Sequence, residues 1–236
     1  MTSSGKLYLI PCTLGGLPAE SLPEHNAALI SNISVFAVED ARSARRFLRS
    51  IGYTKNFDTE VKMYEIDKHL PQQDFSGFFE LIQQGADAGI ISEAGNPCIA
   101  DPGWKIVAEA HRLELHVIPL VGPSAIFLAL AASGLNGQQF CFHGYLPRKQ
   151  DMLISKIKLL EKEARSKQIT QIFMETPYRN EQLFEALKKT LQPDTLLCIA
   201  ADITCSSSFI HTRTIRKWIQ TSCDLRKKNA IFLLGY

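Results

Sequence analysis

Short apolar runs alternate with helical stretches along this chain, and that alternation restricts its fold more than any other feature. The apolar runs, for example Lys6–Pro11 and Ile33–Val38, have the length and character of buried strands. The helical stretches between them are about ten residues long, and strands separated in this way form parallel or mixed sheets through βαβ crossovers. The sequence therefore predicts an α/β protein.

Two α/β domains with mixed sheets are expected, 1–118 and 119–236, because a Gly- and Pro-containing segment at 119–123 interrupts the pattern. In the first domain we expect strands at 6–11, 33–38, 88–92 and 115–120, a basic helix ending at Gly52, a helix from an Asp74 N-cap to Gly85, and a helix at 104–112. In the second domain we expect strands at 140–145, 172–175, 196–201, 208–214 and 230–236, and helices at 125–133, 151–165, 179–191 and around Trp218.

The composition is that of a soluble globular protein, with 45% hydrophobic and 21% charged residues. A net charge of +2 is too small to indicate nucleic-acid binding by itself. The six cysteines form no C-x-x-C pair, and Cys141 and Cys198 lie in apolar runs, which favours reduced, buried thiols. No export signal and no apolar stretch of about 20 residues is present. A cytoplasmic protein without a membrane span is expected.

Several common catalytic signatures are missing. No G-x-G-x-x-G follows the first strand and no G-x-x-x-x-G-K-[ST] occurs, so a dinucleotide oxidoreductase or a P-loop NTPase is not indicated. No serine lies in G-x-S-x-G. The six histidines lack H-x-x-x-H or H-x-x-E-H spacing, so no metal site is expected.

Four loops follow the expected strands and are rich in Gly, Pro, Ser or acidic residues. They are Thr13–Gly16, Glu39–Arg42, Ser92–Gly103 and Val121–Ser124. Each alone is an ordinary strand–helix turn, but ligands of open α/β sheets bind beyond the carboxyl ends of the strands. Together the loops predict a small-molecule crevice at one sheet edge.

Six segments, in order, resemble the tetrapyrrole-methylase-like (class III) superfamily of S-adenosylmethionine-dependent methyltransferases, and most closely its branch acting on small-subunit ribosomal RNA. Ile91–Gly103 is similar to the family's S-D-A-G-T-P-x-I-S-D-P-G, and Val38–Arg42 to A-E-D-T-R. The others are Pro119–Ala125 for P-x-P-G-P-S-A, Ala132–Leu135, Phe142–Lys149 for F-x-G-F-L-P-R-K, and Glu175–Arg179 for E-S-P-H-R.

The resemblance implies two α/β domains with S-adenosylmethionine in the cleft between them, in a homodimer. By the same resemblance, the first domain would contribute Ser92, Glu93, Ala94, Gly95, Asn96, Pro97, Gly122, Pro123 and Ser124 to the cofactor site. The second domain would contribute Met174 and Ala201, although Met174 fits equally well as a core residue.

Methyl transfer requires alignment of the acceptor with the methyl carbon, and a ribose hydroxyl must also lose its proton. Asp40 and Lys149 are the catalytic candidates, with Glu39 and Glu175 as further ionisable groups at motif positions. Asp40 lies beside a basic helix, so a structural ion pair is an equal alternative.

Basic residues in two segments suit RNA phosphates. They are Arg42 and Arg46 on the basic helix, and Arg148 and Lys149 after the strand at 140–145. Arg42, Arg45, Arg46 and Arg49 share one helix face, for which a solvated surface is the alternative.

The chain also departs from the family's patterns. Glu93 and Asn96 replace Asp and Thr, and the H-E-H-N tetrapeptide that follows the basic helix in ribosomal members has no counterpart. Three functions stay open. The first is 2′-O-methylation of small-subunit ribosomal RNA, the second is methylation of a small-molecule or tetrapyrrole-like acceptor, and the third is cofactor or RNA binding without catalysis.

Overall fold

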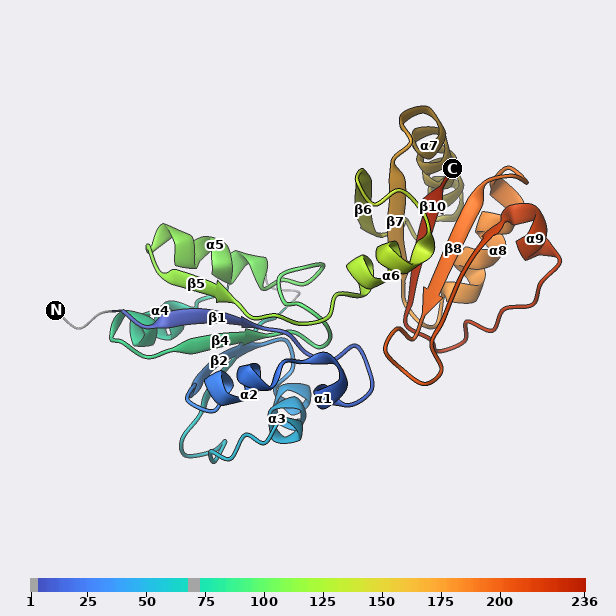
Figure 1. The fold of residues 1–236 in the computed structure, drawn as a ribbon. Coiled ribbons are helices and arrows are strands. Elements are labelled where there is room, and N and C mark those ends of the chain that lie inside the picture. The colour runs from blue at the N-terminus through green and yellow to red at the C-terminus, as the bar shows by residue number, and fades with distance from the viewer. Residues whose placement is uncertain (1–3, 68–72) are drawn as a thin grey trace. The chain divides into compact units, whose positions relative to one another are not determined.

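The protein is described by a computed structural model that covers residues 4–67 and 73–236. The chain divides into two compact units, Met1–Ser124 and Ala125–Tyr236, and each unit has its own five-stranded sheet (Figure 1). The boundary expected after residue 118 falls inside strand β5, His116–Pro119. Because β5 pairs with β1 of the first sheet, the first unit extends through the loop that follows β5.

The first sheet is entirely parallel, in the order β3-β2-β4-β1-β5. Its strands are β1 (Lys6–Ile10), β2 (Val35–Val38), β3 (Lys62–Glu65), β4 (Ala88–Ile91) and β5. The expected strands are present, but β3 was missed. It is a short edge strand with charged residues at both ends and no buried position, so it lacks the apolar run that marks the others.

Helices cover both faces of the first sheet. They are α1 (Pro18–Ser21), α2 (Glu24–Ile30), α3 (Ala41–Ser50), α4 (Ser76–Gln83) and α5 (Trp104–Arg112). Ile30 of α2 and Leu48 of α3 pack into one apolar cluster with Ile10 and Phe36 of the sheet. Helices α4 and α5 pack on the other face around Leu7 and Ile90, and Figure 1 shows α5 and α3 on opposite sides.

The N-terminus of α4 differs by one residue from the expectation. Phe75 occupies the N-cap position instead of Asp74. The Asp74 carboxylate still accepts a hydrogen bond from the Ser76 backbone N–H at 2.8 Å. Asp74 therefore accepts a hydrogen bond from an N–H of the first helical turn although it stands one residue before the N-cap. This bond holds the pKa of Asp74 below its ordinary value.

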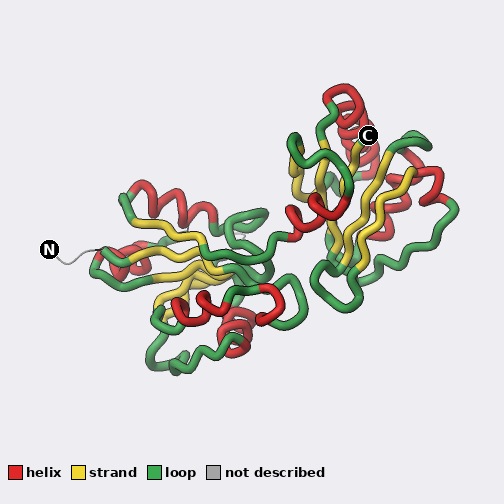
Figure 2. The backbone as a smooth tube through the Cα atoms, in the orientation of Figure 1, coloured by secondary structure: helices red, strands yellow, loops and turns green. Residues whose placement is uncertain are grey.

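The second sheet is mixed, in the order β6-β7-β10-β8-β9. Its strands are β6 (Phe140–Tyr145), β7 (Thr170–Glu175), β8 (Leu196–Ala201), β9 (Phe209–Thr214) and β10 (Ala230–Gly235). Figure 2 shows the strands of both sheets in yellow and the helices in red. β6 is parallel to β7, and β10 runs antiparallel between β7 and β8. The carboxyl ends of β6, β7 and β8 therefore lie at the same edge.

The two faces of the second sheet are covered differently. Its helices are α6 (Ala125–Ser133), α7 (Gln150–Lys167), α8 (Asn180–Thr190) and α9 (Ile215–Ile219). The last three enclose the main core with Phe173 and Phe232. Helix α6 packs on the other face over β8, β9 and β10. The predicted α/β fold is confirmed, with a five-stranded sheet in each unit. The sequence predicts mixed sheets in both domains, but only the second sheet is mixed, because every strand pairing in the first sheet is parallel.

All six cysteines are free thiols. Cys198 is buried as expected, but Cys141 is exposed, which corrects the expectation of a buried thiol there. The reason is topological: Cys141 lies on β6, an edge strand of the second sheet. Among the described residues, no helix is long and apolar enough to cross a membrane.

Candidate functional site

The four loops that the sequence predicts to form a crevice lie at one edge of the first sheet. All five strands of that sheet are parallel, so their carboxyl ends point the same way. The loops after β1 and β4 are neighbours, and their following helices α2 and α5 pack on opposite faces. Such divergence opens space between two loops, and ligands of α/β sheets bind there.

The loops after β1 and β4 are joined by backbone hydrogen bonds. The Cys12 N–H donates to the Gly95 carbonyl at 2.9 Å, and the Gly95 N–H donates to the Cys12 carbonyl at 3.2 Å. The Cys12 thiol donates to the Ser92 carbonyl at 3.1 Å. Burial, reinforced by the nearby charge of Glu39, raises the pKa of Cys12 to about 12. The thiol therefore stays protonated and can donate this hydrogen bond. Segment 92–97 is therefore fixed to the first strand.

Two glycines allow the loops to approach each other. Gly95 has φ of +68°, and a Cβ there would lie 3.1 Å from Leu14 Cδ2 and 3.4 Å from the Pro123 carbonyl oxygen. At Gly122 a Cβ would lie 2.3 Å from two atoms of the Pro11 ring, closer than any real contact. The loops after β1, β4 and β5 thus form one packed assembly, which requires residues without a side chain at positions 95 and 122.

The residues expected to hold the cofactor share this assembly but differ in exposure. Ser92, Gly95, Pro97 and Pro123 are buried; Asn96, Gly122 and Ser124 are half-buried; Glu93 and Ala94 are exposed. The Ser92 hydroxyl lies 3.4 Å from the Ala94 and Gly95 carbonyl oxygens, as their hydrogen-bond donor. The buried members support the loop, and its tip at Glu93–Ala94 is open to solvent.

Two residues outside the predicted cofactor set help to hold these loops. The Glu39 carboxylate accepts a hydrogen bond from the Glu93 N–H at 3.2 Å. The Asn26 amide donates to the Val121 carbonyl at 2.8 Å, and Asn26 is buried. Glu39 belongs to a motif segment and was singled out only as an ionisable group. Asn26 lies in α2, a helix that the sequence did not predict.

Asp40 has a defined structural task as the N-cap of α3. Its carboxylate accepts a hydrogen bond from the Ser43 N–H at 2.7 Å. Hydrogen bonds from the Ser43 backbone and side chain, together with the charges of Arg42 and Arg46, hold the pKa of Asp40 below its ordinary value. A carboxylate with a lowered pKa is a weak base, so the geometry favours the structural alternative.

Asp40→Asn separates the two roles. Asparagine caps helices as well as aspartate does, so we expect the variant to retain activity and to have a free energy of unfolding within about 0.5 kcal/mol of the parent's. Asp40→Ala, which removes the cap, should lose about 1 kcal/mol in urea unfolding. A fall of about 100-fold in the turnover of a normally stable Asp40→Asn variant would instead assign Asp40 to proton transfer.

The four arginines of α3 divide into two pairs. Arg49 donates to the Tyr53 and Lys55 carbonyls and its guanidinium lies 4.2 Å from the Phe57 ring centre. Arg45 forms a 3.4 Å ion pair with Asp58. Arg42 and Arg46 are exposed and pair with no acid within residues 4–67 and 73–236. Only Arg42 and Arg46, the two that the sequence assigned to RNA, are available for phosphates.

In the second unit, Arg148 and Lys149 lie between β6 and α7 and are exposed. Neither forms an ion pair with another residue in the described part of the chain. Met174 and Ala201 end β7 and β8 at the same sheet edge. The segment with Arg148 and Lys149 follows β6, which is parallel to β7, so it lies at this edge of the sheet as well.

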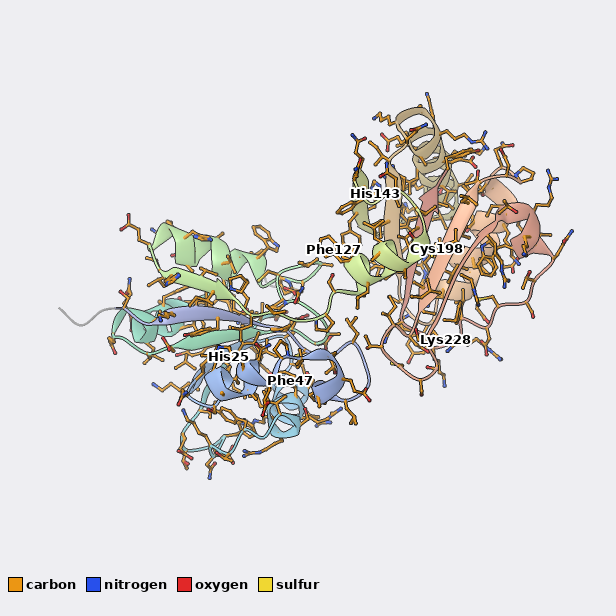
Figure 3. The ribbon with its side chains drawn as sticks, viewed as in Figure 1. His25, Phe47, Phe127, His143, Cys198 and Lys228 are labelled. Carbon is orange, nitrogen blue, oxygen red and sulfur yellow. The ribbon has the colours of Figure 1, made fainter. Side chains whose placement is uncertain are left out.

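The side chains of Met174 and Ala201 nevertheless point to opposite faces of the sheet. The register aligns Met174 with Ile231 and Ala200, whereas Ala201 aligns with Ala230 and Glu175. Ala201 is fully buried in the core beneath α7–α9. Met174 is half-buried on the face that carries α6, whose Phe127 is labelled in Figure 3. A ligand on the Met174 face could meet Ala201 only through its backbone.

No group of three or more His, Cys, Asp or Glu side chains that could hold a metal occurs among the described residues. Glu175 is buried and forms a 3.4 Å ion pair with Arg179, and its carboxylate also accepts the Thr176 N–H at 2.8 Å. Its bonding is therefore local to the turn after β7.

The chain is similar to several known proteins. The family model described as Tetrapyrrole (Corrin/Porphyrin) Methylases matches residues 7–217. A ribosomal RNA small subunit methyltransferase I from Pasteurella multocida (strain Pm70) is 28% identical over 234 residues, 98% of this chain and 79% of that protein. The protein of the same name from Escherichia coli O157:H7 is 26% identical over 235 residues, 98% of this chain and 78% of that protein.

Solved structures show the same fold. The crystal structure of the methyltransferase CobJ has a TM-score of 0.64 at 16% identity, and the match covers 98% of this chain and 94% of that one. The family match, which spans most of the chain, confirms the resemblance carried by the six segments. The chain therefore belongs to the tetrapyrrole (corrin/porphyrin) methylase family and is a methyltransferase.

Proposed function

We propose that this protein transfers a methyl group from S-adenosylmethionine to a ribose 2′-hydroxyl of small-subunit ribosomal RNA. The observation that carries the acceptor is the similarity, over 98% of the chain, to relatives named for methylation of that RNA. A tetrapyrrole-like acceptor is the second candidate, because the family model and the matched fold are those of tetrapyrrole methylases.

The loop assembly of the first unit fits the cofactor. A Cβ at Gly122 would strike the Pro11 ring, and Gly95 has a positive φ beside Leu14, so these glycines let segments 92–97 and 122–124 lie close to the loop after β1, where we place the cofactor. By the resemblance, we also propose Met174 and Ala201 of the second unit as cofactor-binding residues, Met174 through its apolar side chain and Ala201 through its backbone. When bound, S-adenosylmethionine supplies an activated methyl group on a sulfonium centre.

The protein's own residues position the acceptor. Lys149 orients the attacking hydroxyl or a neighbouring phosphate, and Arg148, Arg42 and Arg46 hold backbone phosphates. Asp40 maintains α3, which carries Arg42 and Arg46, through its N-cap bond. These residues therefore act by alignment and charge.

We also propose that the protein is a cytoplasmic homodimer. Support comes from α6, which is apolar on every face although Phe127 and Leu128 are exposed. A helix that is apolar all round is normally covered, and a second copy would provide the cover.

Two experiments test this proposal. Titration calorimetry with S-adenosylmethionine and S-adenosylhomocysteine should show binding, and an absence of heat together with an absence of thermal shift would exclude the cofactor. Mass spectrometry of ribosomal RNA nucleosides from a deletion strain should show the loss of one 2′-O-methyl nucleoside. An unchanged nucleoside profile would reject the RNA acceptor.

The paired substitution Arg148→Ala and Lys149→Ala is expected to weaken RNA binding without changing cofactor affinity. Loss of two phosphate contacts should also lower the slope of log K against log salt by about 2. Lys158→Ala with Lys162→Ala removes the same charge from exposed positions on α7 and serves as the control. Equal losses of RNA and cofactor binding in the first pair would contradict the assigned role.

A further inference from the structure

Two exposed tyrosines lie at the edge of the second sheet where Arg148 and Lys149 lie. Tyr145 ends β6, and Tyr178 follows β7. Because β6 and β7 are adjacent and parallel, both tyrosines are at the carboxyl-end edge of neighbouring strands. We call Tyr145, Arg148, Lys149 and Tyr178 the aromatic–basic rim.

Tyr178 is presented by a rigid turn. Tyr178 is 85% exposed, although a side chain with a large apolar ring normally buries much of its surface. The turn is closed by the Arg179 N–H, which donates to the Thr176 carbonyl at 2.9 Å. Pro177 restricts the backbone before Tyr178, and the Glu175–Arg179 ion pair joins the two sides of the turn. The ring is therefore held out from the surface by an ordered backbone.

Tyr145 is aimed by an irregularity in its strand. The register between β6 and β7 shifts between Phe142 and Tyr145, and Gly144 in this interval has φ of +63°. Such bulges redirect the side chains that follow them. After the shift Tyr145 pairs with Met174, the residue that we place beside the cofactor, and Tyr145 remains 58% exposed.

The rim combines flat rings with cations. Arg148 and Lys149 follow Tyr145 after two intervening residues and are exposed. Proteins that bind single-stranded nucleic acid combine cations that follow the phosphates with aromatic rings on which unpaired bases stack. A duplex offers no free base face, so exposed rings add little to its binding. The combination fits unpaired RNA.

We propose that Tyr145 and Tyr178 stack on unpaired bases, so that the aromatic–basic rim binds the acceptor RNA as a single strand or an opened loop. This inference rests on the proposed RNA acceptor and adds the form of RNA that is bound. Tyr145 acts beside the cofactor and positions the target nucleotide, and Tyr178 holds a base further along the strand.

Fluorescence anisotropy with labelled RNA tests the inference. The probes are an unstructured oligouridylate and an RNA duplex of the same length. Wild-type protein should prefer the single strand, and Tyr178→Ala and Tyr145→Ala should each weaken single-strand binding about tenfold, the effect of losing one stacked base. Tyr178→Phe and Tyr145→Phe retain the ring and should bind like wild type.

Tyr236→Ala is the matched control. Tyr236 is another exposed tyrosine, and its ring lies against the Arg165 guanidinium at 4.1 Å, away from the rim in sequence. Its replacement should leave RNA affinity unchanged. With methyl-deficient small ribosomal subunits as substrate, the two rim alanine variants should raise KM, and calorimetry should show unchanged cofactor affinity.

The outcomes separate this inference from the function on which it rests. Methylation of ribosomal RNA by wild type, with unchanged RNA affinity in both rim alanine variants, would overturn the stacking inference alone. Preference of wild type for the duplex, or equal losses in the alanine and phenylalanine variants, would also overturn it. If wild type neither binds RNA nor methylates ribosomal subunits, the proposed RNA acceptor itself fails.

Discussion

Gly122→Ala is expected to weaken S-adenosylmethionine binding about tenfold or more, a change of about 1.4 kcal/mol. A Cβ at residue 122 would lie 2.3 Å from Cβ and Cγ of Pro11. A proline ring cannot rotate away, so the loop after β5 must move from the loop after β1. Overpacking of this kind also costs about 1–3 kcal/mol of stability. Titration calorimetry measures the affinity and urea unfolding measures the stability.

Gly137→Ala controls for the change of residue type, since a Cβ at residue 137 meets no atom within 4 Å. That variant should bind the cofactor normally. A folded Gly122→Ala variant with wild-type cofactor affinity would contradict the assignment of segment 122–124 to the site.

Trp218→Ala is expected to destabilise the second unit by about 3–5 kcal/mol, the range for removing a large buried aromatic side chain. Trp218 is 1% exposed, and its indole N–H donates to the Leu197 carbonyl at 2.8 Å. Its ring meets Phe184 edge-on at 5.5 Å between ring centres. Its removal leaves a cavity and loses the indole hydrogen bond to Leu197, so urea unfolding followed by circular dichroism should shift to lower urea.

The chain has only one other tryptophan, Trp104, in the first unit. Trp104→Ala is the matched control, because this side chain is 57% exposed and its loss should change stability by about 0.5 kcal/mol or less. In Trp218→Ala, tryptophan fluorescence reports the first unit alone. Equal stability losses in the two variants would contradict the core role of Trp218.

Local signals predicted most secondary structure. The apolar runs of β1, β2 and β4 are fully formed strands, and the expected helix at 104–112 is α5. The missed elements lack such signals. β3 has charged ends and is partly exposed, and α1 and α2 are short and lie in a Pro-containing segment. Their formation depends on pairing and packing with distant residues, which local patterns do not encode.

The candidate site shows the same division. Motif segments predict the cofactor loop at 92–97, and this stays a prediction; such a loop can be proposed from sequence because its residues are adjacent in the chain. They also placed Arg42 and Arg46 on the exposed face of α3. They did not reveal that Arg45 and Arg49 are held by the loop at 53–58 or that Asp40 caps a helix, because these roles depend on side-chain geometry.

By itself, the sequence determined the α/β class, the order of most strands and helices, and the segments that mark the methylase family. These properties reside in local periodicity and in contiguous motifs. The tertiary structure decided which loops touch and which side chains share a face. Backbone hydrogen bonds between Cys12 and Gly95 join the loops after the adjacent strands β1 and β4. Met174 and Ala201 face opposite ways because side chains alternate along paired strands. Strand order and register alone define such neighbours, and both arise from packing of the whole unit.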